Sequence, residues 1–214
     1  MATRQNGNVL FYILIAIFLL GALTVALRSS GTMEGGIDKE SANVKAQQII
    51  RYGGEVAQAV QIILDNGASE TDIRFAHPNA DATYGTITTN PQNQVFSSQG
   101  GKATYRLAPT GANTGDKWIF AGNFALPQVG SDRADLVALL NVTQPVCNAI
   151  NSQLGIESTP AISCGTTTAF IGTYAASPTV INPASFTQLP VMQVCYRCTN
   201  ITDYYSYSAV LYAR

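Results

Sequence analysis

The cysteine pair in "CYRC", Cys195 to Cys198, is the stretch of this sequence that comes nearest to a reactive motif. A thiol–disulfide catalyst places its CxxC at the N-terminus of a helix that follows a strand, because the helix dipole lowers the pKa of the first thiol. Here the motif is followed by "TNITDYY", which has the composition of loop and strand. We therefore interpret Cys195 and Cys198 as structural disulfide cysteines and expect no redox catalysis.

The cysteines are confined to the last third of the chain, at Cys147, Cys164, Cys195 and Cys198. Beyond a membrane span with a cytoplasmic N-terminus they would lie in an oxidising compartment, where two disulfides are expected. Four cysteines allow three pairings, and the sequence leaves the choice open. We favour bonds that join Cys147 and Cys164 to the "CYRC" pair, because longer closed loops stabilise more in the chain-entropy model.

Other arrangements of reactive side chains are missing from the sequence. His77 is the single histidine, so no His cluster exists to hold zinc. No GxSxG, GxxxxGK[ST] or HExxH motif occurs, and the glycine-rich stretches lack the strand-to-helix context of phosphate sites. Asn79 and Asp81 lack the later ligands of a calcium loop, and Asp132 and Asp135 flank a turn. We predict no catalytic residue, no cofactor and no metal site, and a protein that is not an enzyme.

The elements that position these residues begin with a long apolar run. Val9 to Leu27 is free of charge over about 19 residues, and a helix of that length extends about 28 Å, close to the ~30 Å hydrocarbon core of a membrane. Secretory signals have shorter apolar cores of ~7–15 residues. We therefore expect a transmembrane helix that signal peptidase does not remove. Arg4 precedes it and mixed charges follow Arg28, which favours a cytoplasmic N-terminus and an exported body.

A glycine-containing joint and an amphipathic helix follow the apolar run. The stretch "RSSGTMEGGIDKE" contains glycines that weaken a helix. After it, apolar residues fall on one side at helical spacing, at Ile49, Gly53, Val56, Val60, Ile63 and Leu64. This pattern predicts a helix of about 25 residues that ends at Asn66 and Gly67. Its apolar stripe packs on the body's own sheet or docks a partner protein, and we favour the sheet.

From Thr71 onward, short β-type runs alternate with turn residues. The predicted strands are "TDIRFAHP", "YGTITT", "ATYRLAP", "KWIFAGNF", "DLVALLNV", "AFIGTY", "VMQVCYRC" and "YYSYSAVLYAR". In the last of these, Tyr205, Tyr207, Ala209 and Leu211 alternate with the side chains of a second face. A further helix is predicted at "TQPVCNAINSQLGI", with Thr143 as its N-cap residue and Gly155 as its end.

The expected fold class is α+β. A long N-terminal helix, with a transmembrane half and an amphipathic half, packs on a small antiparallel β-sheet, with one further short helix and a disulfide-bonded C-terminal region. The expected division of the chain is a cytoplasmic leader at 1–7, a transmembrane or stem helix at 8–28, a joint at 29–43 and an extracytoplasmic α+β domain at 44–214.

Composition narrows the range of partners. Charged residues make up 12% of the chain, about half of the ~25% found in average globular proteins, and the net charge is −1. Lys and Arg are scattered singly, so no basic patch exists to meet a phosphate backbone. We therefore expect no nucleic acid partner.

Several of these features together resemble type IV pilins and pseudopilins. A short leader contains Arg4 and ends at Gly7, the apolar helix starts directly after it, and an amphipathic helix and a cystine-containing sheet domain follow. The chain is similar to uncharacterised bacterial pilin-like proteins with "GNxLFYILI" beginnings, "CxxINxxLGI" helices and "LxAR" ends. The resemblance implies cleavage by prepilin peptidase between Gly7 and Asn8. The fifth mature residue, a glutamate in pilins, is Tyr12 here.

Two functions are compatible with these features. The resemblance implies a structural subunit of a type IV pilus-like or pseudopilus assembly, of the minor kind because Tyr12 replaces the glutamate. In it, a neighbouring helix would approach the small residues Gly21, Ala22 and Ala26. The alternative is an uncut, single-pass, membrane-anchored extracytoplasmic binding or envelope protein. Expected partners are the membrane and other pilin-like subunits or further copies of this chain. The expected location is the inner membrane, with the body in the periplasm or in a surface filament.

Overall fold

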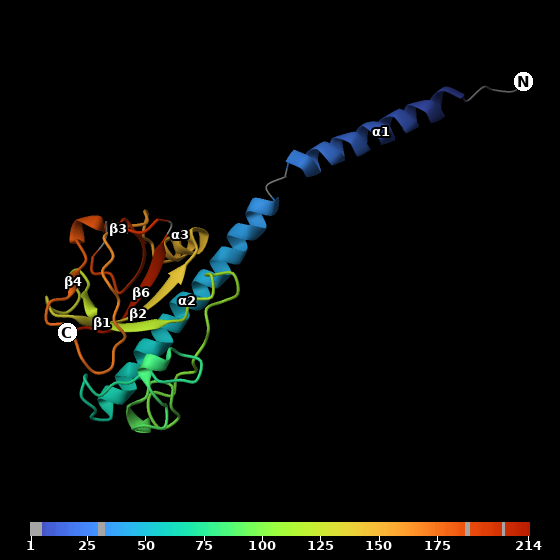
Figure 1. The fold of residues 1–214 in the computed structure, drawn as a ribbon. Coiled ribbons are helices and arrows are strands. Elements are labelled where there is room, and N and C mark those ends of the chain that lie inside the picture. The colour runs from blue at the N-terminus through green and yellow to red at the C-terminus, as the bar shows by residue number, and fades with distance from the viewer. Residues whose placement is uncertain (1–5, 30–32, 187–188, 203) are drawn as a thin grey trace, which may run out of the picture. The chain divides into compact units, whose positions relative to one another are not determined.

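The computed structural model describes residues 6–29, 33–186, 189–202 and 204–214, with the backbone alone at 6–10, 25–29, 33–37 and 185. The chain divides into two compact units, Met1–Ser41 and Ala42–Arg214. The first unit holds helix α1 (Asn6–Ser29) and the start of helix α2 (Met33–Asp65). The second unit holds the rest of α2 and the elements that follow it, whose succession along the chain can be traced in Figure 1.

The N-terminal helices differ from the expected arrangement. The prediction of one long N-terminal helix, with a transmembrane half and an amphipathic half, is wrong. α1 ends at Ser29 and α2 begins at Met33, so the apolar and amphipathic segments are separate helices. Within the described residues, no helix combines the length and the apolar character needed to cross a membrane.

The part of α2 that belongs to the second unit is amphipathic as predicted. Its apolar stripe is buried in the core at Ile49, Val56, Val60 and Ile63. Its polar side is exposed at Gln47, Gln48, Arg51 and Gln58. The helix ends at Asp65, and Gly67 adopts a φ of +90°, the left-handed conformation that commonly terminates helices.

A six-stranded sheet forms the centre of the second unit. Its strands are β1 (Ile119–Ala125), β2 (Asp135–Val142), β3 (Ala161–Ile162), β4 (Thr179–Val180), β5 (Gln193–Cys198) and β6 (Tyr205–Tyr212), in the order β3-β5-β6-β2-β1-β4. The expected small antiparallel sheet is also wrong, because β3 pairs in parallel with β5 and β4 with β1. The inner pairs are antiparallel. Two parallel strands need a long connection between them, whereas a short hairpin can join only antiparallel strands. Long connections lead from β1 to β4 and from β3 to β5, which permits the parallel pairs at the two edges.

Both faces of this sheet are covered. The alternation predicted for β6 is present, and Tyr205, Tyr207, Ala209 and Leu211 face the core containing α2. Val210 belongs to a second core on the opposite face, together with Val137 and Leu139 of β2. In Figure 1, α2 runs past the sheet. The segments between α3 and β5 contribute Ile156, Ile162, Ile181 and Val191 to the core on the opposite face, whereas Phe170 packs in the core with α2. The central strands are therefore buried on both sides.

The segment between α2 and β1 is where the strand predictions are wrong. Residues 66–118, which are described throughout, contain the short 3₁₀ helices η1 (Ala82–Tyr84) and η2 (Pro91–Asn93) but no strand. The runs "TDIRFAHP", "YGTITT" and "ATYRLAP" therefore form no strand, and the first contributes only an isolated bridge between Arg74 and Gln94. "AFIGTY" contributes only an isolated bridge between Ala169 and Ala121.

A buried glutamine explains how this long segment stays ordered without strand partners. Gln94 is 2% exposed, and its side-chain oxygen accepts a hydrogen bond from the Ala76 amide at 3.0 Å. Its side-chain nitrogen donates to the carbonyls of Thr86 at 3.3 Å and Thr89 at 2.9 Å. One side chain thus satisfies backbone groups from two loops that a neighbouring strand would otherwise satisfy.

Helix α3 (Gln144–Gln153) lies where the sequence predicted a helix. Thr143 occupies the N-cap position, but its side chain makes no capping hydrogen bond, and Pro145 stands in the first turn. Val146 and Ile150 are buried, and Gly155 has a φ of +74° just beyond the end. The apolar side of α3 therefore faces the core.

The contact between α2 and β6 predicts opposite effects for two adjacent glycines. A Cβ on Gly53 would overlap the Tyr207 hydroxyl and lie 3.0 Å from the Ala209 Cβ, whereas a Cβ on Gly54 would meet nothing within 4 Å. We expect Gly53→Ala to lower the free energy of unfolding by about 1–3 kcal/mol through overpacking. Gly54→Ala should raise it by roughly 0.5–1 kcal/mol, because alanine favours a helix interior. Urea unfolding of both variants checks this, and equal effects would contradict the close approach.

Candidate functional site

The first candidate surface is the described part of α1. Its large apolar side chains are all exposed, from 40% for Ile15 to 75% for Phe18. Thr24 donates its hydroxyl to the Gly21 carbonyl at 2.8 Å, so its polar group is satisfied within the helix. The helix carries no acidic residue in its first turn. Apart from the hydroxyl of the exposed Tyr12, the described part of α1 therefore presents an apolar surface.

The structure describes some of the α1 residues for which the sequence predicts helix packing or cleavage. Gly21 and Ala22 are exposed, and a Cβ on Gly21 would meet nothing within 4 Å, so both positions are open to an approaching helix. The side chain of Ala26 lies outside the described side chains. Gly7 and Asn8 fall in the first turn of α1, where the backbone alone is described. Most of the predicted leader, residues 1–5, lies outside the described residues.

The second feature is the pair of disulfides, and here the prediction is confirmed. Cys147 bonds to Cys195, and Cys164 bonds to Cys198, so the long-range pairing is the one present. The first bond fastens α3 to β5, and the second fastens the segment after β3 to the end of β5. The "CYRC" cysteines therefore bond to two different segments and do not bond to each other.

A buried asparagine reinforces the first disulfide. Asn151 lies one helical turn after Cys147 and is 2% exposed. Its side-chain oxygen accepts from the Cys195 amide at 2.9 Å, and its nitrogen donates to the Cys195 carbonyl at 2.7 Å. The carboxamide therefore takes the place of another strand beside β5. Nothing in the spacing of the sequence indicates this role, because a side chain that pairs with a backbone leaves no periodic pattern.

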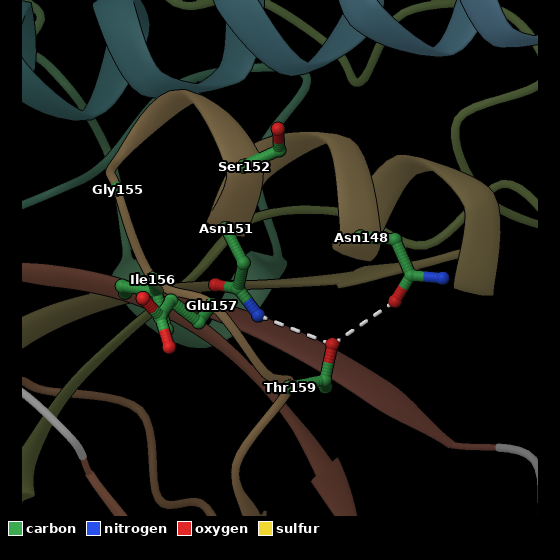
Figure 2. Close-up of a pocket in the computed structure, with 7 residues that line it drawn as sticks. All are labelled: Asn148, Asn151, Ser152, Gly155, Ile156, Glu157 and Thr159. Atoms are coloured by element: carbon green, nitrogen blue, oxygen red, sulfur yellow. Dashed lines mark hydrogen bonds between the residues drawn. The ribbon is translucent and has the colours of Figure 1, made fainter.

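The third feature is a polar cavity of about 540 Å³ at the C-terminal end of α3, shown in Figure 2. Its walls carry the side chains of Asn148, Asn151, Ser152, Ile156, Glu157 and Thr159. The Thr159 hydroxyl lies between the two asparagines, 3.0 Å from the Asn148 Oδ1 and 3.3 Å from the Asn151 Nδ2. The cavity thus combines amide, hydroxyl and carboxylate groups that are not gathered into any sequence motif.

The residues considered for acid–base or metal chemistry do not form a site. Within the described residues, no group of three or more His, Cys, Asp or Glu side chains could hold a metal ion. Asp81 accepts from the Thr83 amide at 2.9 Å, and that hydrogen bond lowers the pKa of Asp81. Asp132 is exposed, whereas Asp135 is fully buried. The two carboxylates that flank the turn therefore have separate environments.

Asp135 belongs to a structural cluster that the sequence did not indicate. Its carboxylate accepts from the backbone amides of Leu126 and Arg214, each at 3.0 Å. Burial raises the pKa of Asp135, although these two hydrogen bonds oppose the shift. The Arg214 guanidinium lies 2.8 Å from Glu70 and 4.0 Å from the centre of the Tyr174 ring. The cluster ties Arg214, two residues past the end of β6, to three other segments of the second unit.

The Asn151 carboxamide predicts a sharp contrast between two neighbouring asparagines. Asn151→Ala leaves two buried backbone groups of Cys195 without partners, and we expect a loss of about 2–4 kcal/mol in the free energy of unfolding. Asn148 is exposed and bonds only to Thr159 among the described residues, so Asn148→Ala should cost under about 1 kcal/mol. Chemical denaturation with both disulfides intact measures both values. A small loss for Asn151→Ala would mean that another group replaces the carboxamide.

His77 predicts a weakening of the fold on mild acidification. Its ring stacks on Tyr105 at 4.6 Å, its Nδ1 accepts from the Asn79 amide at 3.1 Å, and burial lowers its pKa. The unfolded chain therefore takes up this proton at a higher pH than the folded protein, and stability falls as the pH drops below about 6.5. The chain has one histidine. His77→Phe, which keeps an aromatic ring on Tyr105, should flatten the stability profile between about pH 5.5 and 7.5. An unchanged slope would assign the effect to other groups.

Comparison with known proteins gives no match: no family model, no curated protein and no solved structure matches the chain.

Proposed function

We propose that this protein is a structural subunit of a pilus-like or pseudopilus-like assembly, in which α1 packs against the α1 helices of other copies or of related subunits. The observation that carries the proposal is the exposure of every large apolar side chain described in α1, Phe11 to Leu23. A helix that is apolar on all sides is stable in water only when another apolar surface covers it. Helices of the same kind supply such a surface.

The chemistry of α1 suits a helix bundle. The Thr24 hydroxyl is satisfied by the Gly21 carbonyl, which leaves the exposed Tyr12 hydroxyl as the other polar side-chain group in the described part. Gly21 and Ala22 are small and exposed, which allows two helix backbones to come close. Bulky neighbours such as Phe18 and Leu19 then fill the space on either side.

The second unit suits the exposed part of such an assembly. Two disulfides join α3 and the segment after β3 to β5, and both faces of the sheet are covered. Disulfides persist in oxidising compartments outside the cytoplasm. The proposal therefore places this unit outside the cytoplasmic membrane and gives α1 the role of the stem.

Cross-linking between α1 helices tests the proposal. A cysteine introduced at the exposed position 19, by Leu19→Cys, should form disulfide-linked dimers under mild oxidation in the native host, because copies of α1 would lie side by side. Leu107→Cys is the matched control, since Leu107 is 60% exposed but lies in the second unit. Dimers for Leu19→Cys alone would support the proposal.

The mature N-terminus separates the two candidate functions. Protein from membrane and sheared-surface fractions would be sequenced from its N-terminus. Asn8 as first residue in the sheared fraction supports the filament subunit. An intact Met1 or Ala2 confined to membranes, with no dimers for Leu19→Cys, would overturn it in favour of a membrane-anchored envelope protein.

A further inference from the structure

We infer that the cavity at the C-terminal end of α3 is a binding site for a neutral saccharide. The inference is independent of the proposed function, because it concerns the second unit alone. The volume of about 540 Å³ lies within the ~300–1,000 Å³ typical of small-molecule sites. Figure 2 shows the side chains of Asn148 and Asn151 converging on the Thr159 hydroxyl, with Glu157 on the far side of Asn151.

The charges around the cavity exclude an anionic ligand. None of the lining residues is basic, and Glu157 contributes a negative charge. The cavity also lies at the end of α3 where the backbone carbonyls of the helix terminate, which adds a partial negative charge. A ligand that brings hydroxyl donors is favoured here, and a phosphate or carboxylate is disfavoured.

One wall of the cavity is held in place before any ligand arrives. The Asn151 side chain is fixed by its two hydrogen bonds to Cys195, and the Cys147–Cys195 disulfide holds the same turn of α3 on β5. Thr159 is fixed in turn by Asn151 and Asn148. A wall whose side chains are already ordered loses little conformational freedom when a ligand binds.

Other groups at the opening remain available. Among the described residues, no hydrogen-bond partner exists for the Asn148 Nδ2, the Ser152 hydroxyl or the Glu157 carboxylate. These supply an amide donor, a hydroxyl that both donates and accepts, and a strong acceptor. Ile156 adds a small apolar surface at the same place. Donors and acceptors beside an apolar spot match the adjacent hydroxyls and the C–H face of a sugar ring.

The test is a titration of the full chain followed by NMR of the side-chain amides of Asn148 and Asn151. The protein would be held in a detergent without a sugar headgroup, and the probes are glucose, N-acetylglucosamine and their β-1,4-linked disaccharides. We expect saturable shifts of both amides with a millimolar Kd for at least one probe. Inorganic phosphate serves as the anionic control and should cause no shift.

Two variants make the result specific to the cavity. Asn148→Ala removes the free donor and should weaken binding about tenfold, the effect of losing one hydrogen bond. Gln144→Ala truncates another exposed amide on α3 and should leave the Kd unchanged. Ser152→Ala provides a second lining variant with an expected weakening. The absence of shifts up to about 50 mM sugar, or equal affinity in the Asn148→Ala and Gln144→Ala proteins, would overturn the inference.

Discussion

The distance between α2 and the sheet is set where Gly53 lies against Tyr207. A side chain at Gly53 would occupy the space of the Tyr207 hydroxyl, which instead donates to the side-chain oxygen of Gln193 at 2.7 Å. The Tyr207 ring is fully buried and meets Trp118 edge to face at 6.0 Å. Because the helix comes this close, the stripe from Ile49 to Ile63 reaches the sheet and closes its core. The rest of the second unit is arranged around that contact.

The edge of the sheet formed by β3 and β5 is held by a disulfide and by hydrogen bonds from one side chain. At Cys195, a disulfide and a side-chain carboxamide from the same face of α3 meet one residue of β5. β3 pairs with β5 only at Arg197 and Cys198, so this part of the strand would otherwise be an open edge. α3 therefore protects the edge of the sheet and, with its last turn, forms a wall of the polar cavity.

Periodic patterns in the sequence located much of this fold. The stripe of α2, the strands β2, β5 and β6, and helix α3 all repeat apolar residues at the spacing of their element, because each buries one or both sides. The strands expected in residues 71–109 failed for a physical reason: many of their backbone groups are satisfied by Gln94 and by turns, so pairing is limited to an isolated bridge between Arg74 and Gln94. The parallel edge strands also escaped prediction, and the helix expected after the glycine-containing joint begins earlier, at Met33. The role of Asn151 was beyond reach, since it depends on the contact between α3 and β5. The cavity is lined by α3 and the loop that follows it, and its residues match no motif.

The strand order bears on how the chain matures. β6 lies between β5 and β2, although it follows both along the chain, so the sheet cannot close until residues 205–212 have emerged. During passage from the N-terminus, Cys147 and Cys164 appear first, and their native partners follow 48 and 34 residues behind them. The earliest disulfide within reach in an oxidising compartment is therefore a non-native bond between Cys147 and Cys164. The native pairing therefore requires that β5 arrive before oxidation, or that a Cys147–Cys164 bond be exchanged afterwards.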